Sequence, residues 1–207
     1  MTLIYPKSSR MDSSNYDPNI AWAVGAQIAS INYKTFDKFK RIYDSKFRQN
    51  GSCGYVLKPE YMWMSPPRGF VTVPIRLTIH IISGQQLPKP GGKLHGEIID
   101  PFVQIIVEGA HEDVKMQKTR VIDNNGFNPV WDEFFRFDIQ NPDAAIIELA
   151  VYDYSFGDRL EFIAHSGIPL VCIRPGLRHV SLYDKYGMRD GDFEFASLLV
   201  RIGIEGI

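Results

Sequence analysis

The clearest pattern along the chain is a turn signal that runs directly into alternating apolar positions. Residues 124–129 read Asn-Asn-Gly-Phe-Asn-Pro, a run that tolerates positive φ, resists helix and so predicts a chain reversal. The large residues that follow on one face at a period of two are Trp131, Phe135 and Phe137. Asp132 and Arg136 fall on the opposite face, so the stretch predicts a β-strand with one buried and one solvent-facing side.

Similar short segments recur on both sides of this strand, and together they predict eight strands. The first, Ile75–Ile81, alternates isoleucine and leucine with polar residues, so one face is predicted to be buried and the other exposed to solvent. The remaining candidates are Phe102–Val107, Thr119–Ile122, Trp131–Ile139, Ile146–Tyr152, Phe162–Leu170, His179–Leu182 and Leu198–Ile204. Because turn signals rather than helical periods separate them, the C-terminal two-thirds is predicted to be an antiparallel β-sandwich.

The N-terminal residues follow a different order: strand, helix, strand, helix. Asp17 followed by Pro18 predicts a helix start, with aspartate as the N-cap and proline at the first helical position, and Gly25 ends that helix. Residues 27–32 have the length and apolar character of a parallel strand. The second helix carries aromatic residues at helical spacing: Phe36, Phe39, Tyr43 and Phe47. Two β/α units cannot close a barrel or cover their own sheet, so residues 1–60 are predicted to be the end of a larger domain.

Composition and charge support two different domains. The 207 residues are 44% hydrophobic, enough to bury a core, and the net charge is only −1. Residues 1–70 carry 10 basic and 5 acidic side chains, whereas residues 71–207 carry 13 basic and 19 acidic ones. With two cysteines, no signal peptide and no apolar run long enough to span a bilayer, the chain is expected in a reducing intracellular compartment, with peripheral membrane contact at most.

Six short motifs resemble phosphoinositide-specific phospholipase C. They are Ile4–Lys7, Asp12–Tyr16, Phe47–Gly51, Cys53–Pro59, Ile82–Pro88 and Asn124–Pro129. The first four resemble the end of the Y half of the catalytic barrel, and the last two resemble the C2 domain of delta-type members. The resemblance implies the last β/α units of a TIM-type barrel in residues 1–60, a linker in residues 61–73 and an eight-stranded antiparallel C2 sandwich in residues 74–207.

The resemblance also implies an activity, the hydrolysis of phosphatidylinositol 4,5-bisphosphate to diacylglycerol and inositol trisphosphate in calcium-dependent signalling. In this family two histidines and a calcium ion do the chemistry, and all their positions belong to the X half of the barrel, which this sequence does not contain. The histidines that are present are His80, His95, His111, His165 and His179. They lack metal-ligand spacing and are predicted to be ordinary surface or edge residues, so the segment alone is predicted to be inactive.

One substrate contact carries over from the family to the barrel piece. Tyr5 occupies the position where the family places a tyrosine against the inositol ring, a use that suits an aromatic face with a polar tip. Two positions earlier the family has an arginine that holds a ring phosphate, and Leu3 cannot replace that contact. The alternative for Tyr5 is a packed aromatic at the rim of the barrel.

A calcium site in the C2 domain is the second implied site. Carried over by position, its ligands are the Ile98 carbonyl, Asp100, Asn124, Asp153 and the Tyr154 carbonyl. One family carboxylate is replaced by Ser155, which predicts weaker affinity, with Asp158 and Glu161 as nearby acidic residues. The alternative is that these side chains only cap loops. Phe156 at the tip of the same loop is a candidate for shallow membrane insertion.

Two functional hypotheses follow. In the first, the chain is the C-terminal part of a phosphoinositide phospholipase C that works with the missing barrel half, in cis or in trans, on a phosphoinositide-containing membrane at the cytoplasmic inner surface. In the second, it is a non-catalytic C2 lipid-binding or scaffold protein whose residues 1–60 pack on a partner, because orphan β/α units leave apolar patches that demand cover. Neither hypothesis involves nucleic acid.

Overall fold

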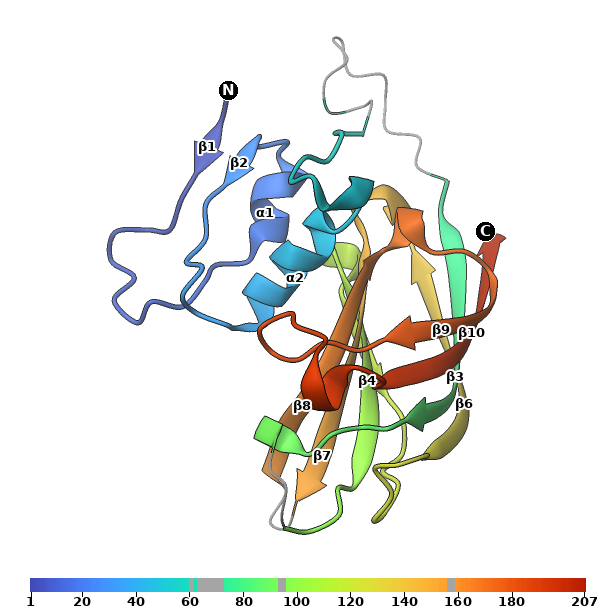
Figure 1. Cartoon of the computed structure of the whole chain (residues 1–207). Helices are drawn as coiled ribbons and strands as arrows, with labels where there is room; N and C mark the ends of the chain where they lie inside the picture. Colours follow the sequence, from blue (N-terminus) through green and yellow to red (C-terminus); the bar gives the residue numbers. More distant parts are fainter. Residues whose placement is uncertain (60–61, 63–72, 93–95, 156–158) are drawn as a thin grey trace.

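The N-terminal residues form a small α/β piece. The computed structural model describes residues 1–59, 62, 73–92, 96–155 and 159–207. Strand β1 (Leu3–Ile4) pairs in parallel with β2 (Ile28–Ala29), and α1 (Pro18–Ala23) connects them (Figure 1). Helix α2 (Lys38–Phe47) follows, and then a 3-10 turn, η1 (Asn50–Ser52). The predicted order of strand, helix, strand and helix is confirmed.

The local signals at the start and end of α1 act as predicted. The Asp17 carboxylate accepts a hydrogen bond from the Asn19 N–H at 3.0 Å, which caps the helix, and Pro18 is its first residue. After the helix Gly25 takes a φ of 72°, a conformation that favours glycine. The predicted strand over residues 27–32 is shorter in the structure, because β2 has only the two-residue β1 to pair with.

The remaining residues form a sandwich of two four-stranded antiparallel sheets. Its strands are β3 (Ile75–Gln85), β4 (Pro101–Glu108), β5 (Lys115–Lys118), β6 (Val130–Ile139), β7 (Ile146–Ser155), β8 (Arg159–Pro169), β9 (Gly176–Ser181) and β10 (Ser197–Gly206). One sheet has the order β6-β3-β10-β9 and the other β5-β4-β7-β8. Short 3-10 turns join several strands: η3 (Pro90–Gly92), η4 (His111–Asp113), η5 (Pro142–Ala144), η6 (Leu170–Cys172) and η7 (Gly191–Phe193). The predicted antiparallel sandwich is confirmed.

The predicted strand over Thr119–Ile122 is wrong. The strand at this place is β5, which pairs with β4 from Lys115 to Lys118. At Thr119 the chain leaves the ladder, because the threonine hydroxyl itself accepts the Val103 N–H at 3.0 Å. The sequence of β5 is Lys-Met-Gln-Lys, so its place depends on backbone pairing with β4 rather than on an apolar pattern.

Strand β6 carries the aromatic face of the core as predicted. Its residues Trp131, Phe135 and Phe137 are buried between the two sheets, while Asp132 and Arg136 are exposed. The turn before it also packs tightly: a Cβ on Gly126 would lie 2.7 Å from Ile99 Cγ1, so only glycine fits there. The large core links both sheets, and the α/β piece has its own small cluster around Ala21, Ala26 and Ala29.

The predicted linker over residues 61–73 lies outside the described residues except at Met62 and Val73. Within the part of the chain that the structure describes, no helix is both long and apolar enough to cross a membrane.

Candidate functional site

Helix α2 packs directly on the sheet that contains β7 and β8 (Figure 1). This interface between α2 and strands β7 and β8 joins the α/β piece to the sandwich and is called the seam below. Two carboxylates of that sheet receive cations from the helix. Arg41 Nε lies 2.8 Å from Glu148 Oε1, and both side chains are almost entirely buried. Lys38 Nζ lies 2.5 Å from Glu108 Oε1, another buried carboxylate. Charged groups are stable in such an environment only when they are paired, so these contacts fix where the helix sits.

The backbones at the seam also approach closely. Ser45 on α2 faces Gly167 on β8, where an added Cβ would lie 1.9 Å from the serine Oγ. The Ser45 hydroxyl turns inward and donates to the Arg41 carbonyl at 2.6 Å. The Arg41 guanidinium lies 4.8 Å from the centre of the Phe162 ring, which adds a cation–π contact. The helix and strand β8 are therefore complementary in shape as well as in charge.

His165 lies at the centre of this seam and corrects the sequence prediction. It was predicted to be a surface or edge residue like the other histidines, but on β8 it is 1% exposed, because α2 and the chain around Tyr183 cover that edge strand. Its Nδ1 lies 3.6 Å from Glu148 Oε1. Burial, together with the positive charges of Arg41 and Arg48, lowers the pKa of His165 to about 3. His95 lies outside the described residues.

The opposite side of the α/β piece has no such cover. Four apolar side chains of β1, β2, α1 and the C-cap of α1 are substantially exposed among the described residues: Leu3, Ile20, Val24 and Ile28. Figure 1 places β1 and β2 on the side of the helices that faces away from the sandwich. The sandwich thus covers one face of the piece, and the strand side remains an apolar surface.

Tyr5 lies directly after β1 on this uncovered side. Its side chain is 70% exposed, so the described residues do not pack over its ring. Leu3, two residues earlier, is half exposed and supplies no charge. Both predicted roles for Tyr5, a contact with the inositol ring and a packed aromatic at the barrel rim, stay predictions.

The residues predicted as calcium ligands gather at one end of the sandwich. Ile98, Asp100, Asp153 and Tyr154, together with Glu161, line a cavity of about 170 Å³ between the chain before β4 and the adjoining ends of β7 and β8, and Asn124 is not part of its lining. The Asp153 carboxylate accepts the Asp100 N–H at 2.8 Å, and the Asp100 carboxylate accepts the Asn124 N–H at 2.6 Å. Both aspartates therefore hold loop backbones together, which is the capping role predicted as the alternative.

The calcium site implied by the family resemblance stays a prediction. Calcium takes six to eight oxygen ligands with several carboxylates, and the described part of this loop cluster brings together no group of three acidic, histidine or cysteine side chains able to hold a metal. The ammonium of Lys89 also lines the cavity, where it donates to the Gly96 carbonyl at 2.8 Å. Phe156 and Asp158 lie outside the described residues.

Comparison with protein-family models gives two matches that divide the chain in the same way as the structure. Residues 75–184 match the C2 domain, and residues 1–61 match the model described as "Phosphatidylinositol-specific phospholipase C, Y domain". The chain belongs to the phosphatidylinositol-specific phospholipase C family. Its sandwich is a C2 domain, and residues 1–61 are a Y-domain segment.

Individual relatives agree with this assignment. The 1-phosphatidylinositol 4,5-bisphosphate phosphodiesterase delta-1 of Homo sapiens is 41% identical in an alignment 214 residues long that covers 99% of this chain and 28% of the relative. The corresponding eta-2 enzyme of Mus musculus is 38% identical and matches 100% of this chain and 14% of its own length. The chain therefore spans less than a third of either relative.

Solved structures give the same picture. The crystal structure of PLC21 from L. pealei superimposes with a TM-score of 0.85 at 32% identity, covering 100% of this chain and 26% of that chain. A C2 domain of plant extended synaptotagmin 1 has a TM-score of 0.53 at 24% identity and covers 65% of this chain and 96% of that chain. The latter likeness concerns the sandwich fold alone.

The sequence reasoning missed the residues that join the Y-domain segment to the C2 domain. Arg41 and Glu148 are 107 positions apart, and no short motif links residues at such a separation. A signal was nevertheless present: Glu148 interrupts an apolar run, Glu108 ends another, and the N-terminal segment carries an excess of basic residues. Buried acids and an oppositely charged neighbour together point to a pairing.

We expect the Arg41–Glu148 pair to control the stability of this seam. Arg41→Met leaves a buried carboxylate without its cation and should lower the free energy of unfolding by about 3–5 kcal/mol in urea denaturation. The double variant Arg41→Met with Glu148→Gln should recover more than half of that loss, because no isolated charge remains. Arg76→Met is the matched control: its pair with Asp138 is half exposed, so stability should hardly change. Equal effects of the two single variants would contradict a special role for the seam.

The buried His165 predicts a specific loss of stability in acid. Its pKa of about 3 in the folded chain lies below the unfolded value of 6.5, so protons bind the unfolded chain preferentially. Its contribution is complete above pH 6.5 and is lost as the pH falls toward 3. Between pH 7 and pH 5 it should cost about 2 kcal/mol of unfolding free energy. His165→Gln should remove this dependence, and His179→Gln, at an exposed position on β9, should retain it. A pH profile that is the same in all three proteins would count against this account.

Proposed function

We propose that this chain forms the last β/α units of a TIM-type catalytic barrel (residues 1–60), a linker (residues 61–73) and a C2 domain (residues 74–207) of a phosphoinositide phospholipase C. The whole protein hydrolyses phosphatidylinositol 4,5-bisphosphate to diacylglycerol and inositol trisphosphate at the cytoplasmic face of a membrane. The observation that carries the proposal is the 41% identity with the human delta-1 phosphodiesterase over 99% of this chain.

The exposed side of the Y-domain segment supports the barrel assignment. Leu3 and Ile28 are opposite each other in the parallel pair β1–β2, and both are exposed, as are Ile20 of α1 and its C-cap residue Val24. A parallel strand pair is stable when further strands and helices cover it. The missing barrel half therefore packs on this side, while the C2 domain supports the helix side through Arg41 and Lys38.

Tyr5 is the residue of this chain that contacts substrate in the proposal. In a β/α barrel the residues just after a strand line the active-site face, and Tyr5 follows β1 directly with an accessible ring. An aromatic face packs on the apolar side of a sugar-like ring, and its hydroxyl can bond a ring oxygen. The proton transfers and the catalytic calcium belong to the upstream half, so the chain alone does not turn over substrate.

A chimaera tests this function directly. This chain replaces the matching segment of the human delta-1 relative, and release of inositol phosphates from vesicles with phosphatidylinositol 4,5-bisphosphate is measured. We expect activity within about tenfold of the delta-1 protein, none from the 207-residue chain alone, and a loss of about tenfold or more in kcat/KM for Tyr5→Ala in the chimaera. Tyr55→Ala, also highly exposed in the Y-domain segment, is the control. Turnover by the chain alone, or a folded but inactive chimaera, would refute the proposal.

In this proposal, binding of the C2 domain to membranes depends little on calcium. Asp100 and Asp153 use their carboxylates on backbone N–H groups, and Ser155 supplies no charge. The fraction of the chain that sediments with phosphatidylserine-containing vesicles should therefore be the same with millimolar calcium and with chelator.

Asparagine variants supply the control for this prediction. Asp100→Asn with Asp153→Asn keeps the hydrogen-bond acceptors and removes both charges, whereas Asp143→Asn with Asp192→Asn changes two exposed aspartates on η5 and η7. Calcium-dependent sedimentation that only the first double variant abolishes would show that a calcium site exists and that this prediction is wrong.

A further inference from the structure

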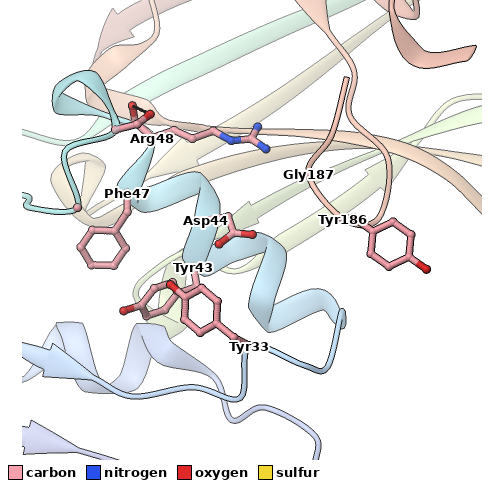
Figure 2. A pocket seen from close by; sticks show the side chains of 9 residues that line it. Tyr33, Tyr43, Asp44, Phe47, Arg48, Tyr186 and Gly187 are labelled. Atoms are coloured by element: carbon pink, nitrogen blue, oxygen red, sulfur yellow. Dashed lines mark hydrogen bonds between the residues drawn. The ribbon is translucent and has the colours of Figure 1, made fainter. Parts of the chain in front are cut away.

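A second cavity lies at the seam, away from Tyr5 and from the loop end of the C2 domain. It has a volume of about 320 Å³ and opens between α2, the η1 turn and the loop around Gly187. Figure 2 shows the rings of Tyr33, Tyr43 and Phe47 on one side, Tyr186 on the other, and the charged groups of Asp44 and Arg48 between them. None of these residues has a part in the proposed hydrolysis.

The two charged residues of the cavity are not equivalent. Both carboxylate oxygens of Asp44 accept hydrogen bonds from the buried Lys40 ammonium, at 2.7 and 2.6 Å, so the negative charge already has a partner. The Arg48 guanidinium carbon lies 3.9 Å from the centre of the Tyr183 ring. Within the described residues the guanidinium donates no hydrogen bond and forms no ion pair with a carboxylate, so its N–H groups remain available to a ligand.

The aromatic walls are held in place before any ligand arrives. Tyr43 contacts Tyr33 and Phe47, with ring centres 5.9 and 4.8 Å apart. Tyr186 packs edge-on against Phe36 at 4.7 Å, so the C2 loop is fixed against the Y-domain segment. A preformed site loses little conformational entropy when a ligand binds.

Hydrogen bonds within the loop that carries Tyr186 hold it in a defined turn. The Asp184 carboxylate accepts the N–H groups of Tyr186 and Met188, each at 2.8 Å. Gly187 has a φ of +81°, and a Cβ there would lie 3.4 Å from an Arg48 guanidinium nitrogen. Glycine thus leaves open the space in front of the guanidinium.

We propose that this cavity binds an organic anion: a carboxylate or phosphate group attached to an aromatic or other flat apolar body. A guanidinium pairs with two oxygens of such a group at once, and the tyrosine and phenylalanine rings stack on the body. A cationic ligand is disfavoured, because the Lys40 ammonium already lies 4.4 Å from the centre of the Tyr33 ring. Since the walls come from both domains, the bound anion bridges the Y-domain segment and the C2 domain.

Titration calorimetry of the whole chain tests the proposal with four probes. Phenyl phosphate and benzoate carry both required parts, inorganic phosphate carries the anion alone and phenol carries the ring alone. We expect saturable one-site binding of phenyl phosphate, benzoate or both, at least about tenfold tighter than either partial probe. The stronger of the two indicates whether the natural ligand presents phosphate or carboxylate.

Variants separate this site from general charge attraction. Arg48→Gln should weaken binding of the preferred probe about tenfold or more, while Arg189→Gln removes one exposed positive charge outside the cavity and should leave it unchanged. Because Arg48→Gln also removes the stack on Tyr183, Tyr186→Ala serves as a second variant: it should weaken phenyl phosphate or benzoate and leave inorganic phosphate unaffected. Absence of saturable binding by both organic anions, or binding that neither variant changes, overturns the proposal.

Discussion

A carboxylate in the middle of an apolar strand must have a cation, and the arrangement of this chain follows from that requirement. Glu148 on β7 is buried, and Arg41 of α2 meets it at 2.8 Å. Lys38 of α2 forms a second ion pair close by, with the buried carboxylate of Glu108 on β4. Helix α2 therefore cannot rest on the sheet at an arbitrary position, because sliding it would leave the buried carboxylates of Glu108 and Glu148 without their cations. The Y-domain segment is held to the C2 domain by this constraint and by the close contact between Ser45 and Gly167.

The sequence predicted well those features whose causes are local. Alternation in β6 and the Asp17 cap depend on residues within a few positions of one another, and each is found where the pattern placed it. Strand β5 was misplaced because its residues are polar and only the neighbouring strand β4 defines it.

Features that depend on contacts between residues far apart in the chain could not be predicted from the sequence. His165 is buried because α2 and the chain near Tyr183 cover an edge strand. The pattern of apolar and polar residues in β8 does not indicate that other segments pack over it. The loop end shows a related limit: position alone carried Asp100 and Asp153 over as calcium ligands, but their hydrogen bonds to backbone N–H groups decide how free those oxygens are. Sequence position can suggest which residues bind a metal, but only the fold shows whether their oxygens are already used to cap loops.

The contact between Ser45 and Gly167 has a consequence for how this protein can change over generations. A side chain at position 167 would collide with the helix, and a larger residue at position 45 would collide with the strand. Neither position can be altered alone, and the charges of Arg41 and Glu148 are tied together in the same way. The C2 domain of this chain is therefore not a portable module: recombination that exchanged it for a sandwich from another lineage would have to bring helix α2 along with it.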